Sequence, residues 1–246
     1  MNDITTSQLM VGSLIVVIAG AAAGSSGFGF AMVATPLLLL TGFPPPFVIA
    51  NSLLLTGATR LSVSIRFWSS IHRNRVLLLV LGSFPGLYLG TRVIAFLDAH
   101  ALKAVVGLVV MLASASLAIN AAKATLQIPS WACMIVGFAG GLLGTSTSLN
   151  GVVPALALVR SGLPTLEFFA DLAVYAVASA CFGVILLALT AGVPRSSLIA
   201  AIVWLPLALV ANAAGVAVGL RLNRRAFSFL ALSFAFAMGA ATVVTA

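Results

Sequence analysis

The sequence predicts an all-α membrane protein with about eight to ten transmembrane segments, because long apolar runs dominate a weakly charged chain. Of the 246 residues, 62% are hydrophobic and 7% are charged, whereas about a quarter of the residues in a soluble domain are charged. Most of the apolar runs approach the roughly 20 residues that a helix needs to cross a bilayer. Composition and run length together exclude a soluble globular fold.

The apolar runs follow one another with short breaks, at 8–24, 28–41, 47–68, 76–96, 101–121, 131–143, 147–159, 167–190, 197–219 and 226–246. The first two runs together would form a helix of roughly 51 Å, which is too long for one crossing. Glycines and serines interrupt this stretch at 24–29, and a similar cluster at 140–151 interrupts the stretch 131–159. Both residue types weaken a continuous helix, so each stretch is predicted to be a broken hairpin of two short helices.

The two broken hairpins are predicted to be copies within a duplicated chain. Three glycines of the first hairpin recur in the second at a shift of 117 positions, so that Gly20, Gly24 and Gly27 match Gly137, Gly141 and Gly144. The pattern Gly-x-x-x-Gly-x-Arg that begins at Gly86 recurs at Gly215 in the same order. The sequence therefore predicts a first membrane repeat over 1–122, a connecting loop at 123–130 and a second repeat over 131–246.

The basic residues predict how the two repeats are oriented. If each half has five segments, the second half is inverted, and one side of the membrane receives Arg73, Arg75, Lys123, Arg160, Arg221, Arg224 and Arg225. The other side receives Arg92, Lys103 and Arg195. Because an excess of Lys and Arg marks the cytoplasmic side, this distribution favours inverted repeats with both termini outside.

Residues with catalytic or metal-binding chemistry are too few for most enzymes. Four acidic residues and two histidines are spread along the chain, which leaves no group suited to a metal centre or to a catalytic pair of carboxylates. The net charge of +8 comes without basic runs interleaved with aromatics, so nucleic acid is not an expected partner. We expect neither an enzyme nor a bound metal, and we expect the chain to lie in a lipid bilayer.

The paired helix breaks predict a central binding site, because broken helices in corresponding halves mark the sites of many transporters. The first N–H groups and the dipole of the short helix after each break favour a small anion as substrate. The candidate substrate-binding residues are Ser25, Ser26, Gly27, Asn51, Ser52, Arg60, Gly144, Thr145, Ser146, Thr147 and Asn150. The alternative is that the residues at the breaks only cap half-helices and allow close packing.

Arg60 lies about thirteen residues into the run 47–68, where a charge costs at least about 2.5–3.5 kcal/mol on insertion scales. Helical spacing lets Thr56, Thr59 and Arg60 border a cavity beside the first break. A fixed guanidinium suits an oxyanion, because its N–H groups form several parallel hydrogen bonds. The alternative is that Arg60 pairs with a helix-end carbonyl or with Asp171.

Glu167 and Asp171 are separated by one helical turn and therefore share a face at the start of the eighth apolar run. A protonatable group near a central site could couple substrate movement to a proton. In the alternative, Glu167 interacts with the dipole at the start of its helix, and Asp171 balances the charge of Arg60.

These motifs resemble the sulfite exporter TauE/SafE family over nearly the whole chain. The segments Gly27-Phe28-Gly29-Phe30, Val33 to Leu38, Gly42-Phe43-Pro44 and Ala50 to Leu53 resemble its first repeat. The segment from Gly140 to Gly151 and the pattern from Gly215 to Leu222 resemble its second repeat and closing motif. The chain departs from the family where Phe30 and Ala31 replace glycines.

The resemblance implies a multi-pass permease of the cell inner membrane, without a cofactor, that exports sulfite, sulfoacetate or other organosulfonates. We interpret the chain as a secondary transporter that works by alternating access around a midplane site. A passive small-anion channel is one alternative, and a non-transporting membrane anchor subunit is another. The pairs Gly86/Gly90 and Gly215/Gly219 also allow close helix contact, either within the chain or between the two chains of a homodimer.

Overall fold

The computed structural model describes residues 5–27, 29–96, 98–120, 129–190, 192–221, 233 and 236–245, and within these ranges it is helical without strands. The elements of the first half are α1 (Thr6–Ser26), α2 (Gly29–Leu40), α3 (Pro45–Arg66), the 3₁₀ turn η1 (Trp68–Ser70), α4 (Arg73–Phe96) and α5 (Ala99–Asn120). Those of the second half are α6 (Ser130–Thr147), α7 (Val152–Arg160), α8 (Thr165–Thr190) and α9 (Arg195–Arg221). A further helical segment covers 236–244.

The helices coincide closely with the predicted apolar runs. Six of them, namely α1, α3, α4, α6, α8 and α9, are long and apolar enough to cross a membrane by length and composition. The predicted all-α membrane fold is therefore confirmed. The predicted connecting loop 123–130 and the first part of the run 226–246 lie largely outside the described residues.

Both predicted breaks are present as helix ends, but the prediction of two short helices at each break is wrong, because α1 and α6 are long enough to cross a membrane and only α2 and α7 are short. Helix α1 stops at Gly27, which has a left-handed φ of 90°, and its N–H donates to the carbonyl of Ala23. The first N–H of α2, at Gly29, donates to the Ser26 hydroxyl at 3.2 Å. Helix α6 stops at Ser148, which also has a positive φ, of 63°. A serine tolerates this conformation less well than a glycine, so the second break holds a strained residue.

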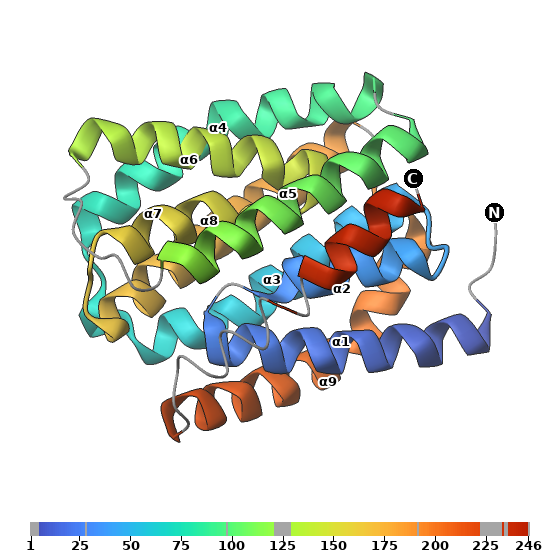
Figure 1. Ribbon diagram of the computed structural model, residues 1–246, viewed down its shortest axis with the longest axis horizontal. Coiled ribbons are helices and arrows are strands. Elements are labelled where there is room, and N and C mark those ends of the chain that lie inside the picture. Colours follow the sequence, from blue (N-terminus) through green and yellow to red (C-terminus); the bar gives the residue numbers. More distant parts are fainter. Residues whose placement is uncertain are drawn as a thin grey trace.

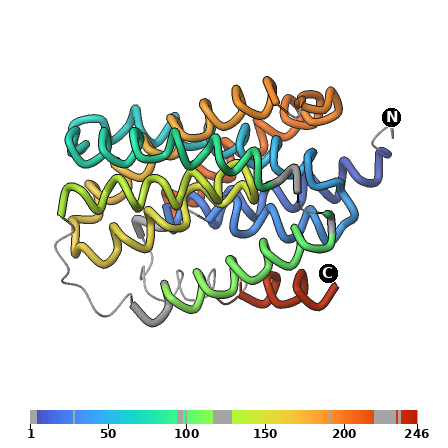
Figure 2. Tube along the Cα trace, turned by 90° about the horizontal axis from the view of Figure 1, so that it is seen from above, coloured from blue at the N-terminus to red at the C-terminus, as the bar shows by residue number. Residues whose placement is uncertain are grey.

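The helices form one bundle whose long axes are roughly aligned (Figure 1). The first residues of α1 and the last residues of the segment 236–245 lie at the same end of this bundle, and the α3–α4 turn lies at the opposite end (Figures 1 and 2). The segment 236–245 runs beside α5, where the two backbones are so close that a Cβ atom added at Gly107 would lie 2.6 Å from the Gly239 carbonyl oxygen. Both four and five segments per half give an even total, so either arrangement places the two ends on the same side.

Equivalent glycines hold equivalent helix pairs together in the two halves. Helix α1 packs along α9, and α4 packs along α6. A Cβ atom at Gly24 would lie 2.2 Å from the Asn212 carbonyl oxygen, and one at Gly141 would lie 2.3 Å from the Ser83 carbonyl oxygen. Gly24 and Gly141 are matched positions of the predicted duplication. The packing thus agrees with a duplicated chain, while the inverted orientation of the repeats stays a prediction.

We expect Gly141→Ala to lower the free energy of unfolding by about 1–3 kcal/mol, because the added methyl group overlaps backbone atoms that have no freedom to rotate away. This cost exceeds the roughly 1 kcal/mol that alanine gains over glycine in a helix. Gly151→Ala is the matched control, since Gly151 has a φ of −83° and an added Cβ meets no atom within 4 Å. Thermal unfolding in detergent measures both, and equal stability of the two variants would contradict the close α4–α6 contact.

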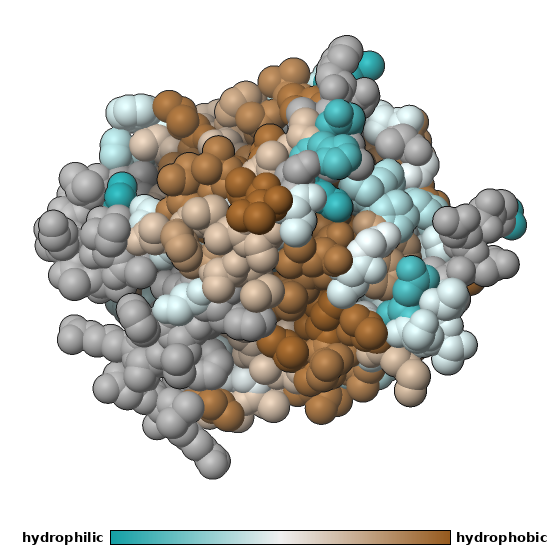
Figure 3. Space-filling view, turned by 45° about the vertical axis from the view of Figure 1, so that its right-hand side comes forward, coloured by the Kyte–Doolittle hydropathy of each residue, from teal (hydrophilic) through white to brown (hydrophobic). Residues whose placement is uncertain are grey.

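The outer surface of the bundle is apolar. Hydrophobic side chains cover much of the face seen in Figure 3, and hydrophilic ones gather towards one edge of it. Large exposed side chains on the outside include Leu14, Leu108, Ile202 and Val210. A soluble protein rarely exposes a continuous apolar area of this kind, so this surface suits contact with lipid.

Candidate functional site

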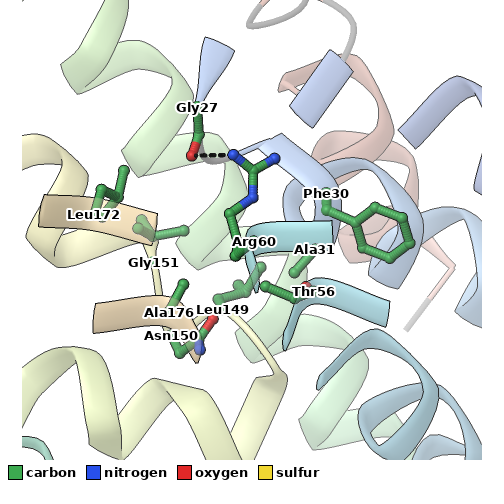
Figure 4. A pocket seen from close by; sticks show the side chains of 11 residues that line it. Gly27, Phe30, Ala31, Thr56, Arg60, Leu149, Asn150, Gly151, Leu172 and Ala176 are labelled. Atoms are coloured by element: carbon green, nitrogen blue, oxygen red, sulfur yellow. Dashed lines mark hydrogen bonds between the residues drawn. The ribbon is translucent and has the colours of Figure 1, made fainter. Parts of the chain in front are cut away.

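A small internal pocket lies between the two helix breaks. The first half contributes Gly27, Phe30, Ala31, Thr56 and Arg60 to its wall. The second half contributes Leu149, Asn150, Gly151, Val152, Leu172 and Ala176. The two breaks therefore meet at one pocket, as predicted, and Figure 4 shows Gly27 and Gly151 next to Arg60, both on the same side of its side chain.

The pocket is closed to a ligand larger than water in this conformation. The space open to the centre of a water-sized sphere is about 10 Å³, which accommodates about one water molecule. Its walls belong to α2, α3 and α8 and to the segment between α6 and α7. Entry of an oxyanion requires these elements to move apart.

Arg60 supplies the charge of the pocket. The residue is 2% exposed, and its guanidinium donates to the Gly27 carbonyl and to Asn212 Oδ1, each at 3.0 Å. A guanidinium carries five N–H donors, so these two bonds leave donor capacity for a further acceptor. Among the described residues, no carboxylate lies within ion-pair distance of Arg60.

The alternative pairing of Arg60 with Asp171 is wrong. Asp171 Oδ2 instead accepts from Arg75 Nε at 2.5 Å, and Asp171 Oδ1 accepts from the backbone N–H of His72 at 2.8 Å. The other alternative, a helix-end carbonyl, is the contact that Arg60 makes, since Gly27 is the C-cap of α1. Arg60 is thus tied to the first break by a hydrogen bond and keeps its charge without an acidic partner among the described residues.

Arg75, Asp171 and Glu167 form a separate cluster at the start of α8. Arg75 also reaches Glu167 Oε2 at 3.2 Å. The Asp171 side chain is fully buried, whereas that of Glu167 is 38% exposed. This cluster ties the beginning of α4 to α8. It lies next to the pocket along the chain, because Leu172 in the pocket wall directly follows Asp171.

The hydroxyl groups at the breaks are bonded to backbone carbonyls in this conformation. Ser25 and Ser26 donate to carbonyls one turn back in α1. Thr145 donates across to the Leu87 carbonyl at 2.6 Å, while Ser146 and Thr147 donate back along α6. None of these five side chains lines the pocket. Their role as substrate ligands stays a prediction, and the hydrogen bonds give them a bracing role in the closed conformation.

Three hydroxyl groups from three elements meet at the second break, outside the residues that line the pocket. Thr35 of α2 shares a hydrogen bond with Ser148 at 2.6 Å and donates to Ser52 of α3 at 3.2 Å. All three side chains are buried. Ser52 was a predicted site residue and Ser148 belongs to the predicted second break, whereas Thr35 was not predicted. The sequence gives no periodic signal for this contact, because Thr35 and Ser148 are 113 positions apart.

The remaining candidates differ in how fully they are bonded. Asn150 lines the pocket and donates to Ser179 at 2.8 Å, and Gly144 packs close to its side chain. Asn51 donates to the Phe47 carbonyl, but its Oδ1 atom is buried without a partner among the described residues. Thr56 Oγ1 is also buried without one, and Thr56 lines the pocket one turn before Arg60. The predicted position of Thr56 beside a cavity is therefore confirmed, whereas Thr59 donates back within α3.

Sequence reasoning missed the apolar walls and the second partner of Arg60. Leu172 and Ala176 lie on α8, within an apolar run whose letters do not distinguish an inner from an outer face. Asn212 could have been found, since it is a polar residue in the middle of the apolar run 197–219. Within the described ranges, no group of three His, Cys, Asp or Glu side chains could hold a metal ion.

Comparison with known proteins gives one match. The sequence model of the family described as sulfite exporter TauE/SafE matches residues 13–242. No match was found among curated proteins or among solved structures. Because the matched region covers nearly the whole chain, this multi-pass membrane protein belongs to the sulfite exporter TauE/SafE family.

Proposed function

We propose that the chain is a secondary transporter of small sulfur-containing oxyanions that moves them out of the cell across the inner membrane. Transport of sulfur anions is the function of the family as a whole. The observation that carries the proposal for this chain is the buried guanidinium of Arg60, which lines a pocket shared by both helix breaks. A charge in the membrane interior is retained only where it serves a function or has a partner, and a sulfonate or sulfite group supplies that partner.

Alternating access explains why the pocket is closed. In this mechanism the two halves rock around a central site, so that the pocket opens to one side at a time. A pocket with room for about one water molecule corresponds to the closed state between the two openings. Residues from both breaks then separate and close again in each cycle. A passive channel would instead need a continuous path through the pocket.

Asp171 and Glu167 are the proposed coupling residues. Protonation of Asp171 would remove one of the two negative charges that hold Arg75, and the start of α4 would then be partly released from α8. Because α8 carries Leu172 and Ala176 of the pocket wall, this release would reach the pocket along one rigid element. A proton taken up at the cluster would in this way favour opening at that end of the bundle.

Transport by purified protein in liposomes tests the proposal. We expect uptake of sulfite or an organosulfonate that saturates with concentration and increases with an imposed proton gradient. Carboxylates such as acetate serve as control anions. Flux that rises linearly without saturation would favour the channel, and the absence of flux for every sulfur anion would reject transport.

The topology can be tested independently of the substrate. We expect both termini on the extracytoplasmic side, because the α3–α4 turn, flanked by Arg66, Arg73 and Arg75, lies at the end of the bundle opposite to them and basic residues mark the cytoplasmic side. A reporter that is active only in the cytoplasm, fused after Ala246, should be silent, while the same reporter inserted in the turn 161–164 should be active. Activity at the C-terminus would contradict the inverted repeat.

A further inference from the structure

We infer that the pocket selects monoanionic sulfonates whose other end is apolar, over zwitterionic or dianionic sulfonates of the same size. This inference rests on the proposed function and narrows its substrate class. The first observation behind it is the charge of the wall, where Arg60 is the only ionisable side chain among the described residues that line the pocket. One fixed positive charge matches one negative charge.

The second observation is that the wall around Arg60 is polar, whereas other parts of the pocket wall are apolar. The α3 wall presents Arg60 and Thr56, and the segment after α6 adds the Asn150 amide. The α8 wall presents Leu172 and Ala176, and α2 presents Phe30 and Ala31 (Figure 4). A ligand with its anionic group against Arg60 therefore directs its remaining atoms towards carbon.

The unpartnered hydroxyl of Thr56 points to a ligand at the polar wall. Its Oγ1 atom is buried with no hydrogen-bond partner among the described residues, and Thr56 precedes Arg60 by one helical turn on the same face. A sulfonate has three oxygens, which can accept from the guanidinium and from this hydroxyl together. This wall thus offers the guanidinium and the hydroxyl to an anion, and among the described residues that line it no carboxylate balances a positive charge.

Substrates with a second charge lack a partner in this pocket. The nearest carboxylate along the chain, that of Asp171, is bonded to Arg75 and to the His72 N–H and does not line the pocket. An ammonium group at the far end of a zwitterion would be buried against the apolar wall without a carboxylate to balance its charge, which is strongly unfavourable. A carboxylate in addition to the sulfonate, as in sulfoacetate, would face the same walls without a second cation.

A matched pair of ligands tests the inference directly. Propane-1-sulfonate and taurine have nearly the same shape, and they differ in a terminal methyl group against an ammonium group. We expect propane-1-sulfonate to bind the purified protein at least about 10-fold more tightly than taurine, because the ammonium is buried unpaired. In the series methane-, ethane- and propane-1-sulfonate, we expect affinity to rise by up to about fourfold for each methylene group. Isothermal titration in detergent measures both effects.

Substitutions in the apolar wall place the effect at this pocket. Ala176→Leu should weaken propane-1-sulfonate at least about 10-fold while sulfite binding changes little, because the added side chain occupies the space of the alkyl group. If Ala176→Leu does not fold, Ala176→Ser is tested instead, because it changes the volume of the side chain little. We expect it to reduce the preference for longer alkyl groups. Cys181→Leu on the exposed face of the same helix is the matched control and should behave as the unmodified protein.

The outcomes separate the inference from the proposed function. Equal affinity for taurine and propane-1-sulfonate, or binding of sulfite without binding of any alkanesulfonate, would overturn the inference and leave transport of sulfur anions standing. Loss of binding for all of these anions would overturn the proposed function itself. A preference for alkanesulfonates that Ala176→Leu and Ala176→Ser both leave unchanged would place the selective site elsewhere and also overturn the inference.

Discussion

Arg60→Lys is expected to leave the protein folded and to weaken binding of sulfur oxyanions by about 10- to 150-fold. A hydrogen bond to a charged group contributes about 1.5–3 kcal/mol, and this range corresponds to the stated change in affinity. The lysine ammonium keeps the positive charge but loses the planar fork, which bonds the Gly27 carbonyl and Asn212 and is proposed to bond an anion at the same time. Titration of the purified variant with sulfite, and with an alkanesulfonate that the unmodified protein binds, measures the loss of affinity.

Arg66→Lys is the matched control for this substitution. Arg66 lies at the exposed end of the same helix, and its guanidinium contacts the Phe67 ring at 5.6 Å. It is six positions beyond Arg60 and does not line the pocket, so its replacement should leave affinity unchanged. If Arg60 served only to cap the end of α1, Arg60→Lys would lower the unfolding temperature while binding stayed as tight as in the unmodified protein. That result would remove Arg60 from the substrate site.

The helices and the breaks could be predicted because their causes are local. Run length in residues fixes whether a helix can cross a bilayer, and a stretch such as 8–41 is too long whatever surrounds it. The clusters of glycine and serine then mark where the helices end, α1 at Gly27 and α6 at Ser148. The depth of Arg60 in its run likewise implied a site, since the cost of its burial depends on depth and not on its neighbours.

The pairing of charged and polar groups could not be predicted from spacing. Arg75 was expected to be a basic residue of the cytoplasmic side, yet its side chain is 17% exposed and bonded to Asp171. This contact depends on how the α3–α4 turn packs against α8, and η1 brings that turn to α8. In the same way Thr145 looked like a free donor at a helix end, but close α4–α6 packing aims its hydroxyl at the Leu87 carbonyl. Tertiary packing determines which polar groups become hydrogen-bond partners. No short pattern in a single sequence shows how segments that are far apart along the chain will pack.

Arg75→Met is expected to lower the free energy of unfolding by about 3–5 kcal/mol, because it leaves the fully buried carboxylate of Asp171 without its cation. Asp171→Asn should cost less, since the amide oxygen still accepts from the His72 N–H, and Arg75 retains Glu167 and partial exposure to solvent. Glu167→Gln is the control, because this partly exposed pair should contribute at most about 1 kcal/mol. Thermal or denaturant unfolding in detergent gives the order of the three.

The double variant Arg75→Met with Asp171→Asn decides whether the two residues act as a pair. We expect it to be more stable than Arg75→Met alone, since no fully buried uncompensated charge then remains, and the Glu167 side chain is 38% exposed to solvent. Its transport should lose the dependence on a proton gradient while binding of sulfonate persists, because Arg60 lies in the pocket and the cluster does not. Additive losses of stability would show that Arg75 and Asp171 stabilise the fold separately. A transport rate that still follows the proton gradient in the double variant would place the coupling group outside this cluster.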